Sequence, residues 1–170
     1  GFFVASRGRH TGLRRDWSSD VCSSDLITEK NAVMFEDNDF EVFIDPDCDG
    51  LNYYEFEINA LGSIWELSLP KPYGEGGVPI LGCNLPGLKS AVQVVGSLND
   101  PSDEDEGWSV EIAFPWAELA KYNKNRATPP EPGDIWKVNF SRVQWKQEVV
   151  DGRYVRSPPQ IGRASGGGRA

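Results

Sequence analysis

The stretch DFEVFID at Asp39–Asp45 alternates apolar and polar side chains, and YYEFEINAL at Tyr53–Leu61 does the same. A period of two is typical of a β-strand with two different faces. Between the two stretches, Pro46–Asn52 (PDCDGLN) is dense in residues that form turns. The sequence therefore predicts a β-hairpin with a loop longer than two residues. Its apolar face would consist of Phe40, Val42 and Ile44 in the first strand and Tyr54, Phe56, Ile58 and Ala60 in the second.

Further strands are expected on both sides of this hairpin. Their predicted ranges are Ile64–Leu69, Lys89–Gly96, Trp108–Phe114 and Ile135–Trp145, separated by connections rich in proline and glycine. At Pro115–Tyr122 one or two helical turns are expected, because proline suits the first helical position and the apolar residues that follow share a face. Short strands with this spacing predict an all-β fold, namely an antiparallel β-sandwich with one short crossover helix.

Composition excludes several classes of function. The chain has 170 residues, which fits one domain, and between residues 27 and 160 it holds 23 acidic against 11 basic residues. Nucleic acid is excluded as a partner, because phosphate binding needs a basic surface. No apolar run of about 18 residues is present, so no membrane span is expected. The single histidine, His10, lies near the N-terminus. Catalytic sites that depend on histidine, and most zinc sites, are therefore excluded for residues 27–159.

Both ends of the chain differ from its middle. Residues 1–26 carry four arginines and a serine- and aspartate-rich run without a structural period. The eleven residues Asp16–Leu26 match, codon by codon, the in-frame translation of a common sequencing-library adapter, and Ile161–Ser165 resembles a partner adapter. We therefore interpret residues 1–26 and 160–170 as disordered artefacts that flank an incomplete domain at residues 27–159.

Four motifs in the middle of the chain carry a family resemblance. They are Asp39–Asp45 (DFEVFID), Tyr53–Ala60 (YYEFEINA), Gly107–Trp116 (GWSVEIAFPW) and Ile135–Trp145 (IWKVNFSRVQW). In this order they resemble carbohydrate-binding module family 9, and more closely the stand-alone family 9-like bacterial proteins. The resemblance implies a sandwich that binds an oligosaccharide or polysaccharide without catalysis, commonly with bound calcium. It also implies an extracellular, periplasmic or cell-surface location, and often an attached glycoside hydrolase domain that degrades polysaccharide.

The resemblance also implies positions for sugar contacts. In the family, two tryptophans enclose a sugar ring. The first aligns with Phe35, and the second lies in a region that this chain does not contain. An acidic sugar-binding residue matches Glu41, whereas a basic residue on the next strand is replaced by Glu57. The family's opening strands, expected before Ile27, are absent.

The polar face of the predicted hairpin independently suits a sugar. It carries Glu41, Phe43, Tyr53, Glu55, Glu57 and Asn59. Sugars have apolar C–H faces and a rim of hydroxyl groups, so aromatic rings beside carboxylates and amides favour their binding. We expect Glu41 and Asn59 to bind hydroxyl groups, and the alternative is a solvated sheet face. Arg142 and Asn139 fall on opposite faces of one strand, so at most one of them reaches a shared site. The expected carbohydrate-binding residues are Phe35, Glu41, Glu57, Asn59, Trp65 and Arg142.

The turn of the hairpin imitates a calcium loop. Asp45, Asp47 and Asp49 occupy positions one, three and five, and Gly50 occupies position six. The closing glutamate of an EF-hand would fall at Phe56 and the flanks are strands, so an EF-hand is excluded. A looser calcium site at the three aspartates and a plain turn both remain as alternatives.

Three further alternatives stay open. Cys48 and Cys83 form a disulfide or are two free thiols. Glu41 with Glu55 or Glu57 has the spacing of a glycosidase pair, but a small sandwich offers no deep cleft to raise one pKa, so a non-catalytic module is favoured. A protein-interaction sandwich with an aromatic surface is the third alternative.

Overall fold

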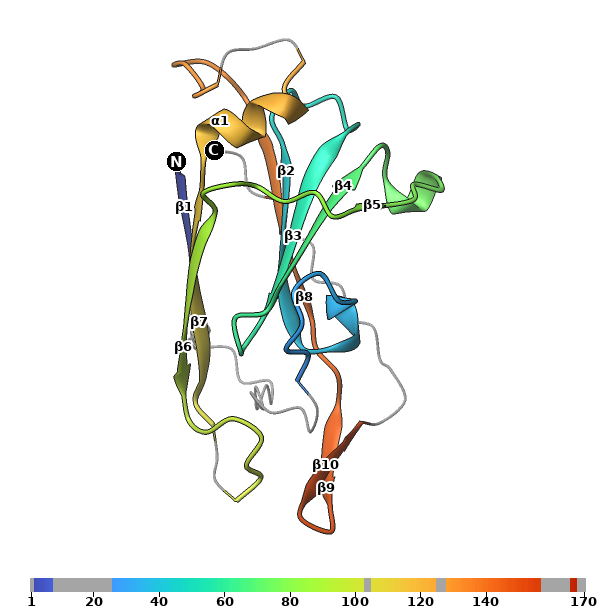
Figure 1. Ribbon diagram of the computed structural model, residues 1–170, viewed down its shortest axis with the longest axis vertical. Helices are drawn as coiled ribbons and strands as arrows, with labels where there is room; N and C mark the ends of the chain where they lie inside the picture. Colours follow the sequence, from blue (N-terminus) through green and yellow to red (C-terminus); the bar gives the residue numbers. More distant parts are fainter. Residues whose placement is uncertain (1, 8–25, 103–104, 125–127, 157–165, 168–170) are drawn as a thin grey trace.

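In the computed structural model, two antiparallel sheets face each other, which confirms the predicted all-β sandwich (Figure 1). The structure describes residues 2–7, 26–102, 105–124, 128–156 and 166–167. Within these residues the larger sheet has the strand order β11-β8-β2-β3-β4-β5, the smaller has the order β1-β7-β6, and β9 and β10 form a separate hairpin. The strands are Phe2–Arg7 (β1), Asp39–Asp45 (β2), Tyr53–Asn59 (β3), Ile64–Leu69 (β4), Ile80–Leu81 (β5), Lys89–Val95 (β6), Gly107–Phe114 (β7), Lys137–Val143 (β8), Gln147–Val150 (β9), Arg153–Arg156 (β10) and Gly166–Gly167 (β11).

The main core lies between the two sheets. The predicted apolar face of the hairpin fills one side of it, and alternate residues of β7 fill the other. Phe114 contacts Tyr54 and Phe56 edge to face, with ring centroids 6.1 and 5.6 Å apart. Burial of this apolar surface is the main term that stabilises the sandwich. The core residues of the two sheets are Val42, Ile44, Tyr54, Phe56 and Ile58 in the larger and Val110, Ile112 and Phe114 in the smaller.

One short helix crosses from the smaller sheet to the larger, as predicted. The α-helix α1 (Trp116–Leu119) continues into the 3₁₀ turn η3 (Ala120–Tyr122) and leads from β7 towards β8. Leu119 and Tyr122 are buried against the main core. The crossover therefore closes one end of the sandwich.

Strand β8 pairs with β2 although about ninety residues separate them in the sequence. In this antiparallel register Glu41 is opposite Ser141, and Phe43 is opposite Asn139. On the other side of β2, Glu41 is opposite Glu57 of β3. Residues opposite each other point to the same face of a sheet, so the register decides which side chains can share a site.

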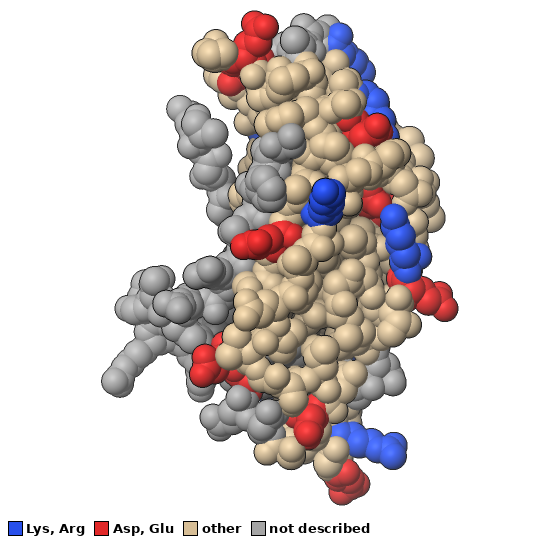
Figure 2. Space-filling view, turned by 60° about the vertical axis from the view of Figure 1, so that its left-hand side comes forward, with Lys and Arg blue, Asp and Glu red and all other residues tan. Residues whose placement is uncertain are grey.

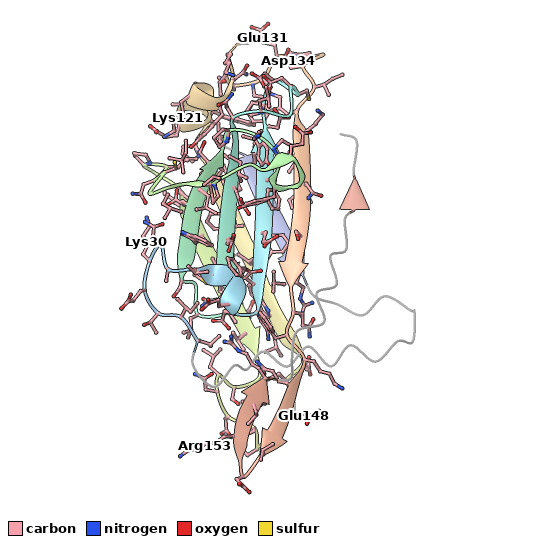
Figure 3. All side chains as sticks on the ribbon, turned by 90° about the vertical axis from the view of Figure 1, so that its right-hand side faces the viewer. Lys30, Lys121, Glu131, Asp134, Glu148 and Arg153 are labelled. Carbon is pink, nitrogen blue, oxygen red and sulfur yellow. The ribbon has the colours of Figure 1, made fainter. Side chains whose placement is uncertain are left out.

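The segment before β2 covers part of the outer face of the larger sheet (Figure 3). It contains the 3₁₀ turn η1 (Met34–Glu36), which contacts β3. Met34 packs with Trp65 and Leu67 in a small second core. The backbone N–H of Asn31 donates to the carbonyl of Ile64 at 2.8 Å. A cover of this kind removes one part of the face from solvent and leaves another part open.

Two described strands lie in the flanks for which the sequence predicted disorder. Phe2–Arg7 forms β1 and pairs with β7, and Gly166–Gly167 forms β11 and pairs with β8. Within the flanks these two short segments are therefore described as strands. Apart from Leu26, the adapter-like segments lie outside the described residues, so their origin stays a prediction.

Candidate functional site

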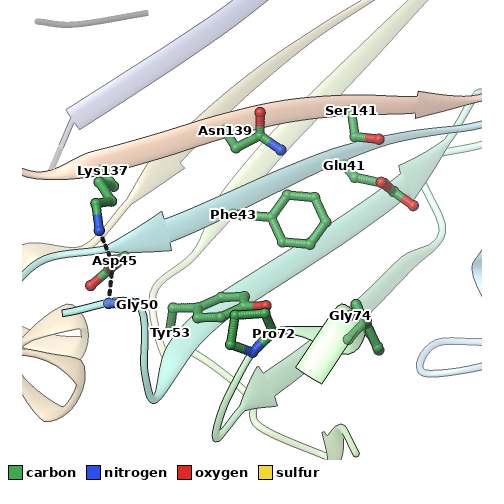
Figure 4. Close-up of a pocket in the computed structure, with 11 residues that line it drawn as sticks. Glu41, Phe43, Asp45, Gly50, Tyr53, Pro72, Gly74, Lys137, Asn139 and Ser141 are labelled. Atoms are coloured by element: carbon green, nitrogen blue, oxygen red, sulfur yellow. Dashed lines mark hydrogen bonds and ion pairs between the residues drawn. The ribbon is translucent and has the colours of Figure 1, made fainter. Parts of the chain in front are cut away.

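A groove of about 390 Å³ on the outer face of the larger sheet is the candidate site (Figure 4). Its walls come from β2, β8, the start of β3 and the loop that contains the 3₁₀ turn η2 (Tyr73–Glu75). The groove mixes aromatic rings with carboxylate, amide, hydroxyl and ammonium groups. The lining residues are Glu41, Phe43, Asp45, Gly50, Tyr53, Pro72, Tyr73, Gly74, Lys137, Asn139 and Ser141.

Two aromatic rings form the floor of the groove. Phe43 lies at its middle in Figure 4, with Tyr53 beside it. The ring centroids are 6.3 Å apart and the ring planes are inclined by 60°. Both side chains are partly exposed, because they occupy positions whose strand neighbours point into the core. Exposed ring faces of this kind can stack against the apolar face of a ligand.

Polar groups border these rings. Asn139 and Ser141 lie on β8, opposite Phe43 and Glu41, and both are partly exposed. In the part of the chain that the structure describes, neither side chain forms a hydrogen bond, so both have free donors and acceptors. At the far end of the groove the Lys137 ammonium group is 3.9 Å from Asp45 Oδ2. The border can therefore exchange hydrogen bonds with a hydroxyl-rich ligand.

Arg142 does not reach the groove. It is opposite Phe40, which packs against the main core, so its side chain points to the other face of the sheet. Burial lowers the pKa of its guanidinium group, and the negative charge of Asp39 opposes that shift. Of the two residues, Asn139 lines the groove and Arg142 does not.

Asn59 is fully buried and its side chain has no free hydrogen-bonding group. Its amide nitrogen donates to the carbonyl of Ile27 at 2.8 Å and to Asp37 Oδ2 at 3.1 Å. Its amide oxygen accepts from the N–H groups of Leu61 and Ser63. All four hydrogen bonds of an asparagine are thus made inside the protein. The prediction that Asn59 binds sugar hydroxyl groups is wrong, because it joins the covering segment to β3 instead.

Phe35 and Trp65 lie together, away from the groove lining. Their ring centroids are 6.0 Å apart with planes inclined by 39°. Trp65 is 5% exposed and belongs to the small second core, whereas Phe35 is 48% exposed. The indole N–H of Trp145 donates to the Phe35 carbonyl at 3.1 Å. Trp65 therefore packs inward, and of this pair only Phe35 offers a ring to solvent.

The acidic part of the polar face is buried rather than solvated. Glu55 and Glu57 are each 2% exposed, and the hydroxyl of Tyr73 donates to Glu55 Oε2 at 2.8 Å. The alternative of a solvated sheet face does not hold for Glu55 and Glu57, because residues 26–38 and the η2 loop lie over them. Burial, together with the negative charges around them, raises the pKa of Asp39 and of Glu57. Of the predicted residues, Glu41 lines the groove and Glu57 lies beneath the cover.

The three aspartates of the β2–β3 turn lie close together. Each accepts a backbone N–H: Asp45 from Gly50, Asp47 from Lys124 and Asp49 from Leu51. Lysine ammonium groups lie 3.9 Å from Asp45 and 4.0 Å from Asp49. One oxygen of Asp45 and one of Asp47 are buried without a donor, so oxygen ligands for calcium are present. Backbone amides and lysines already interact with these carboxylates, so the alternative of a plain turn without an ion also agrees with the structure. Calcium at this turn stays a prediction.

Cys48 and Cys83 are free thiols. The thiol of Cys48 donates to the carbonyl of Ile135 at 3.1 Å, and that of Cys83 to the carbonyl of Ile80 at 3.4 Å. The alternative in which the two residues stay unpaired is confirmed.

The side of the molecule that carries the smaller sheet shows charged side chains scattered among uncharged ones (Figure 2). In the described part of that side they do not gather into a patch of one sign. The described residues also contain no helix of the length and apolarity that a bilayer crossing requires.

Comparisons with known proteins give one similar structure to report. No protein-family model matches the chain, and no curated protein matches it. The crystal structure of a "putative carbohydrate-binding protein" from Bacteroides uniformis is 18% identical, with a TM-score of 0.48. The match covers 69% of this chain and 50% of that one, so this chain spans half the length of the neighbour. Fold and groove together define an antiparallel β-sandwich with an aromatic and polar surface site.

Proposed function

We propose that this domain binds carbohydrate without catalysis, in the groove around Phe43. The observation that carries the proposal is the pair of partly exposed rings, Phe43 and Tyr53, beside the unengaged side chains of Asn139 and Ser141. A sugar ring has an apolar face for stacking and hydroxyl groups for an amide and a hydroxyl to bind. The open groove suits a segment of an oligosaccharide or polysaccharide.

The role in polysaccharide degradation is part of the same proposal. The four motifs that resemble carbohydrate-binding module family 9 support an accessory module that acts outside the cytoplasm beside a glycoside hydrolase domain. Glu41 supports both parts of the proposal, because it matches the acidic sugar-binding residue of that family and also lines the groove. Phe35 and Trp65 would contribute to a sugar site only outside this groove.

The arrangement of carboxylates supports binding rather than hydrolysis. Glycosidases place two carboxyl groups about 5–10 Å apart on either side of the scissile bond. The groove is lined by Glu41 and Asp45, which lie at opposite ends of it in Figure 4. Asp45 is held by the amide of Gly50 and lies beside Lys137. Glu57, the predicted partner of Glu41, is buried and does not line the groove.

Titration calorimetry of the whole chain against a panel of soluble oligosaccharides and polysaccharides tests the proposal. We expect Phe43→Ala to weaken binding about tenfold or more, because a stacked ring contributes on the order of 1 kcal/mol or more. Phe140→Ala is the matched control, since Phe140 is exposed on the opposite face of β8. Equal affinities for the protein and Phe43→Ala would contradict the groove as the site. A chain that responds to none of the sugars would favour the protein-interaction alternative.

A further inference from the structure

Among the described residues that line the groove, the only basic one is Lys137, and its charge is already engaged. The Lys137 ammonium group donates to the carbonyl of Cys48 at 2.8 Å and lies 3.9 Å from Asp45 Oδ2. Figure 4 shows this pair together at one end of the groove. The negative charge of Asp45 offsets that of the ammonium group, so the groove offers little positive charge to an anionic ligand.

Glu41, at the other end of the groove, has no such partner. Its side chain is only 8% exposed, and among the described residues its carboxylate accepts no hydrogen bond and forms no ion pair. Its neighbours Asp39 and Glu57 are hydrogen-bonded to each other beneath the cover, and burial raises the pKa of both, so this pair holds protons. The negative charge at this end of the groove therefore comes from Glu41. A largely buried carboxylate without a partner gains most from a ligand that is charged oppositely.

The aromatic floor begins next to this carboxylate. Glu41 and Phe43 are two residues apart on β2, which places them on the same face about 7 Å apart along the strand. The Tyr53 ring lies beside Phe43, and both rings are partly exposed. Ring faces attract an ammonium group electrostatically, and a carboxylate forms a charge-assisted hydrogen bond with it. A sugar unit that stacks on Phe43 therefore brings its substituents between an aromatic ring and the carboxylate of Glu41.

We propose that the ligand of this groove is an amino sugar with a free ammonium group, as in an oligomer of glucosamine, and that the carboxylate of Glu41 binds this group. The inference rests on the proposed carbohydrate binding and names the class of sugar. A uronic acid would instead place a carboxylate against Glu41, and like charges repel each other. The 23 acidic against 11 basic residues between residues 27 and 160 also attract a cationic polymer from a distance.

Titration calorimetry of the whole chain against tetrasaccharides that share one β-1,4 linkage tests the inference. The probes are cellotetraose and the tetramers of N-acetylglucosamine, glucosamine and glucuronic acid, in a mildly acidic buffer that keeps the amino groups protonated. We expect the glucosamine tetramer to bind about tenfold or more tightly than cellotetraose or the N-acetylated tetramer, because a hydrogen bond between charged groups replaces a neutral one. Added salt should reduce this preference, and the glucuronic acid tetramer should bind most weakly.

Glu41→Gln removes the charge and keeps the shape of the side chain. We expect this variant to bind the glucosamine tetramer about tenfold more weakly than the parent does, and to lose less affinity for cellotetraose. Glu111→Gln is the matched control, because Glu111 is exposed on β7 of the smaller sheet, and it should keep the preference of the parent. Circular dichroism shows whether Glu41→Gln is folded. The salt dependence and the comparison with the N-acetylated tetramer test the inference on the parent chain alone.

Equal affinities for the glucosamine tetramer and cellotetraose, or a preference for the glucuronic acid tetramer, would overturn the inference and leave carbohydrate binding intact. A preference that persists in Glu41→Gln would overturn the assignment of Glu41. Tetralysine is the last probe: affinity equal to that for the glucosamine tetramer would show that the groove recognises ammonium groups and not an amino sugar. Binding of none of the tetrasaccharides would overturn the proposed function together with the inference.

Discussion

The side-chain amide of Asn59 donates a hydrogen bond to the Asp37 carboxylate at 3.1 Å, and both residues are completely buried. The same amide nitrogen binds the carbonyl of Ile27, so one strand residue holds two points of the covering segment. Asp37 also accepts the backbone N–H of Ile27 at 3.0 Å. The cover over the acidic face is thus attached to β3 by a polar network inside the protein.

Removal of this network should destabilise the protein. Asn59→Ala deletes four hydrogen bonds: the Asp37 carboxylate and the carbonyl of Ile27 each lose one donor, and the backbone N–H groups of Leu61 and Ser63 lose their acceptor. We expect the free energy of unfolding to fall by about 2–4 kcal/mol, since each unsatisfied buried group costs about 1–3 kcal/mol and the losses are partly compensated by water. Urea denaturation followed by circular dichroism measures the change.

Asn139→Ala is the matched control, because this asparagine faces the groove instead. We expect its free energy of unfolding to stay within about 0.5 kcal/mol of the parent value, as for other surface changes. Its sugar affinity should fall, whereas Asn59→Ala should retain affinity at temperatures where it is folded. The reverse pattern would show that Asn59, and not Asn139, contacts the ligand.

A second network centres on Glu66, which is buried on the core face of the larger sheet, opposite Phe56. The Tyr54 hydroxyl donates to Glu66 Oε1 at 2.9 Å, the N–H of Leu85 donates to the same oxygen at 2.7 Å, and Lys30 lies 3.1 Å from Oε2. Tyr54→Phe should lower the free energy of unfolding by about 1.5–3 kcal/mol, the typical value for a hydrogen bond to a charged group. Thermal unfolding with a fixed buffer and pH measures it.

Tyr73→Phe is the control for that change. Its hydroxyl donates to Glu55, but the Tyr73 ring is partly exposed, so water can replace the lost bond. We expect a smaller loss of stability than in Tyr54→Phe. Equal losses would mean that the burial of the Tyr54 hydroxyl does not strengthen its hydrogen bond.

The stability of the protein should depend on the protonation of Glu57. Burial and the charges of Asp39, Glu55 and Glu41 raise the pKa of Glu57, so the folded state holds a proton that the unfolded chain releases above about pH 4.3. Folding stability should therefore fall as pH rises from about 5 to 8 in chelator. Glu57→Gln has no such proton to lose, so its stability should exceed that of the parent by a margin that grows with pH.

Denaturation curves at several pH values in chelator, with Glu148→Gln as an exposed control, measure this margin. Glu148 lies on the β9–β10 hairpin in contact with solvent, so its replacement should follow the parent curve. A constant margin across the pH range would show that Glu57 is not protonated in the folded protein.

The hairpin and its apolar face could be predicted because alternation is a local property of the chain. The strand pairs Val42 with Phe56 and Ile44 with Tyr54 follow from that pattern and a short turn. The pairing of β8 with β2 could not be predicted, since it joins residues about ninety positions apart. Without that register the sequence could not decide between Arg142 and Asn139, and the structure selects Asn139.

The candidate site was only partly predictable, because the sequence shows which residues share a face but not which part of that face is covered. Aromatic residues at polar-face positions, Phe43 and Tyr53, were visible as a signal in the sequence, and they form the floor of the groove. The burial of Glu57 and Asn59 had no such signal. It depends on residues 26–38, which cover the face through a short 3₁₀ turn and isolated hydrogen bonds rather than through a periodic element.

Attachment of residues 26–38 to β3 also bears on how the protein is trimmed for expression. A polypeptide that started at Asp39 would keep every strand of the hairpin but would lose Met34, the Asp37 carboxylate and the carbonyl of Ile27. Water would then reach Trp65 and Leu67, and the freshly uncovered apolar surface would favour aggregation. The shortest version of this domain suitable for recombinant production therefore begins ahead of Ile27.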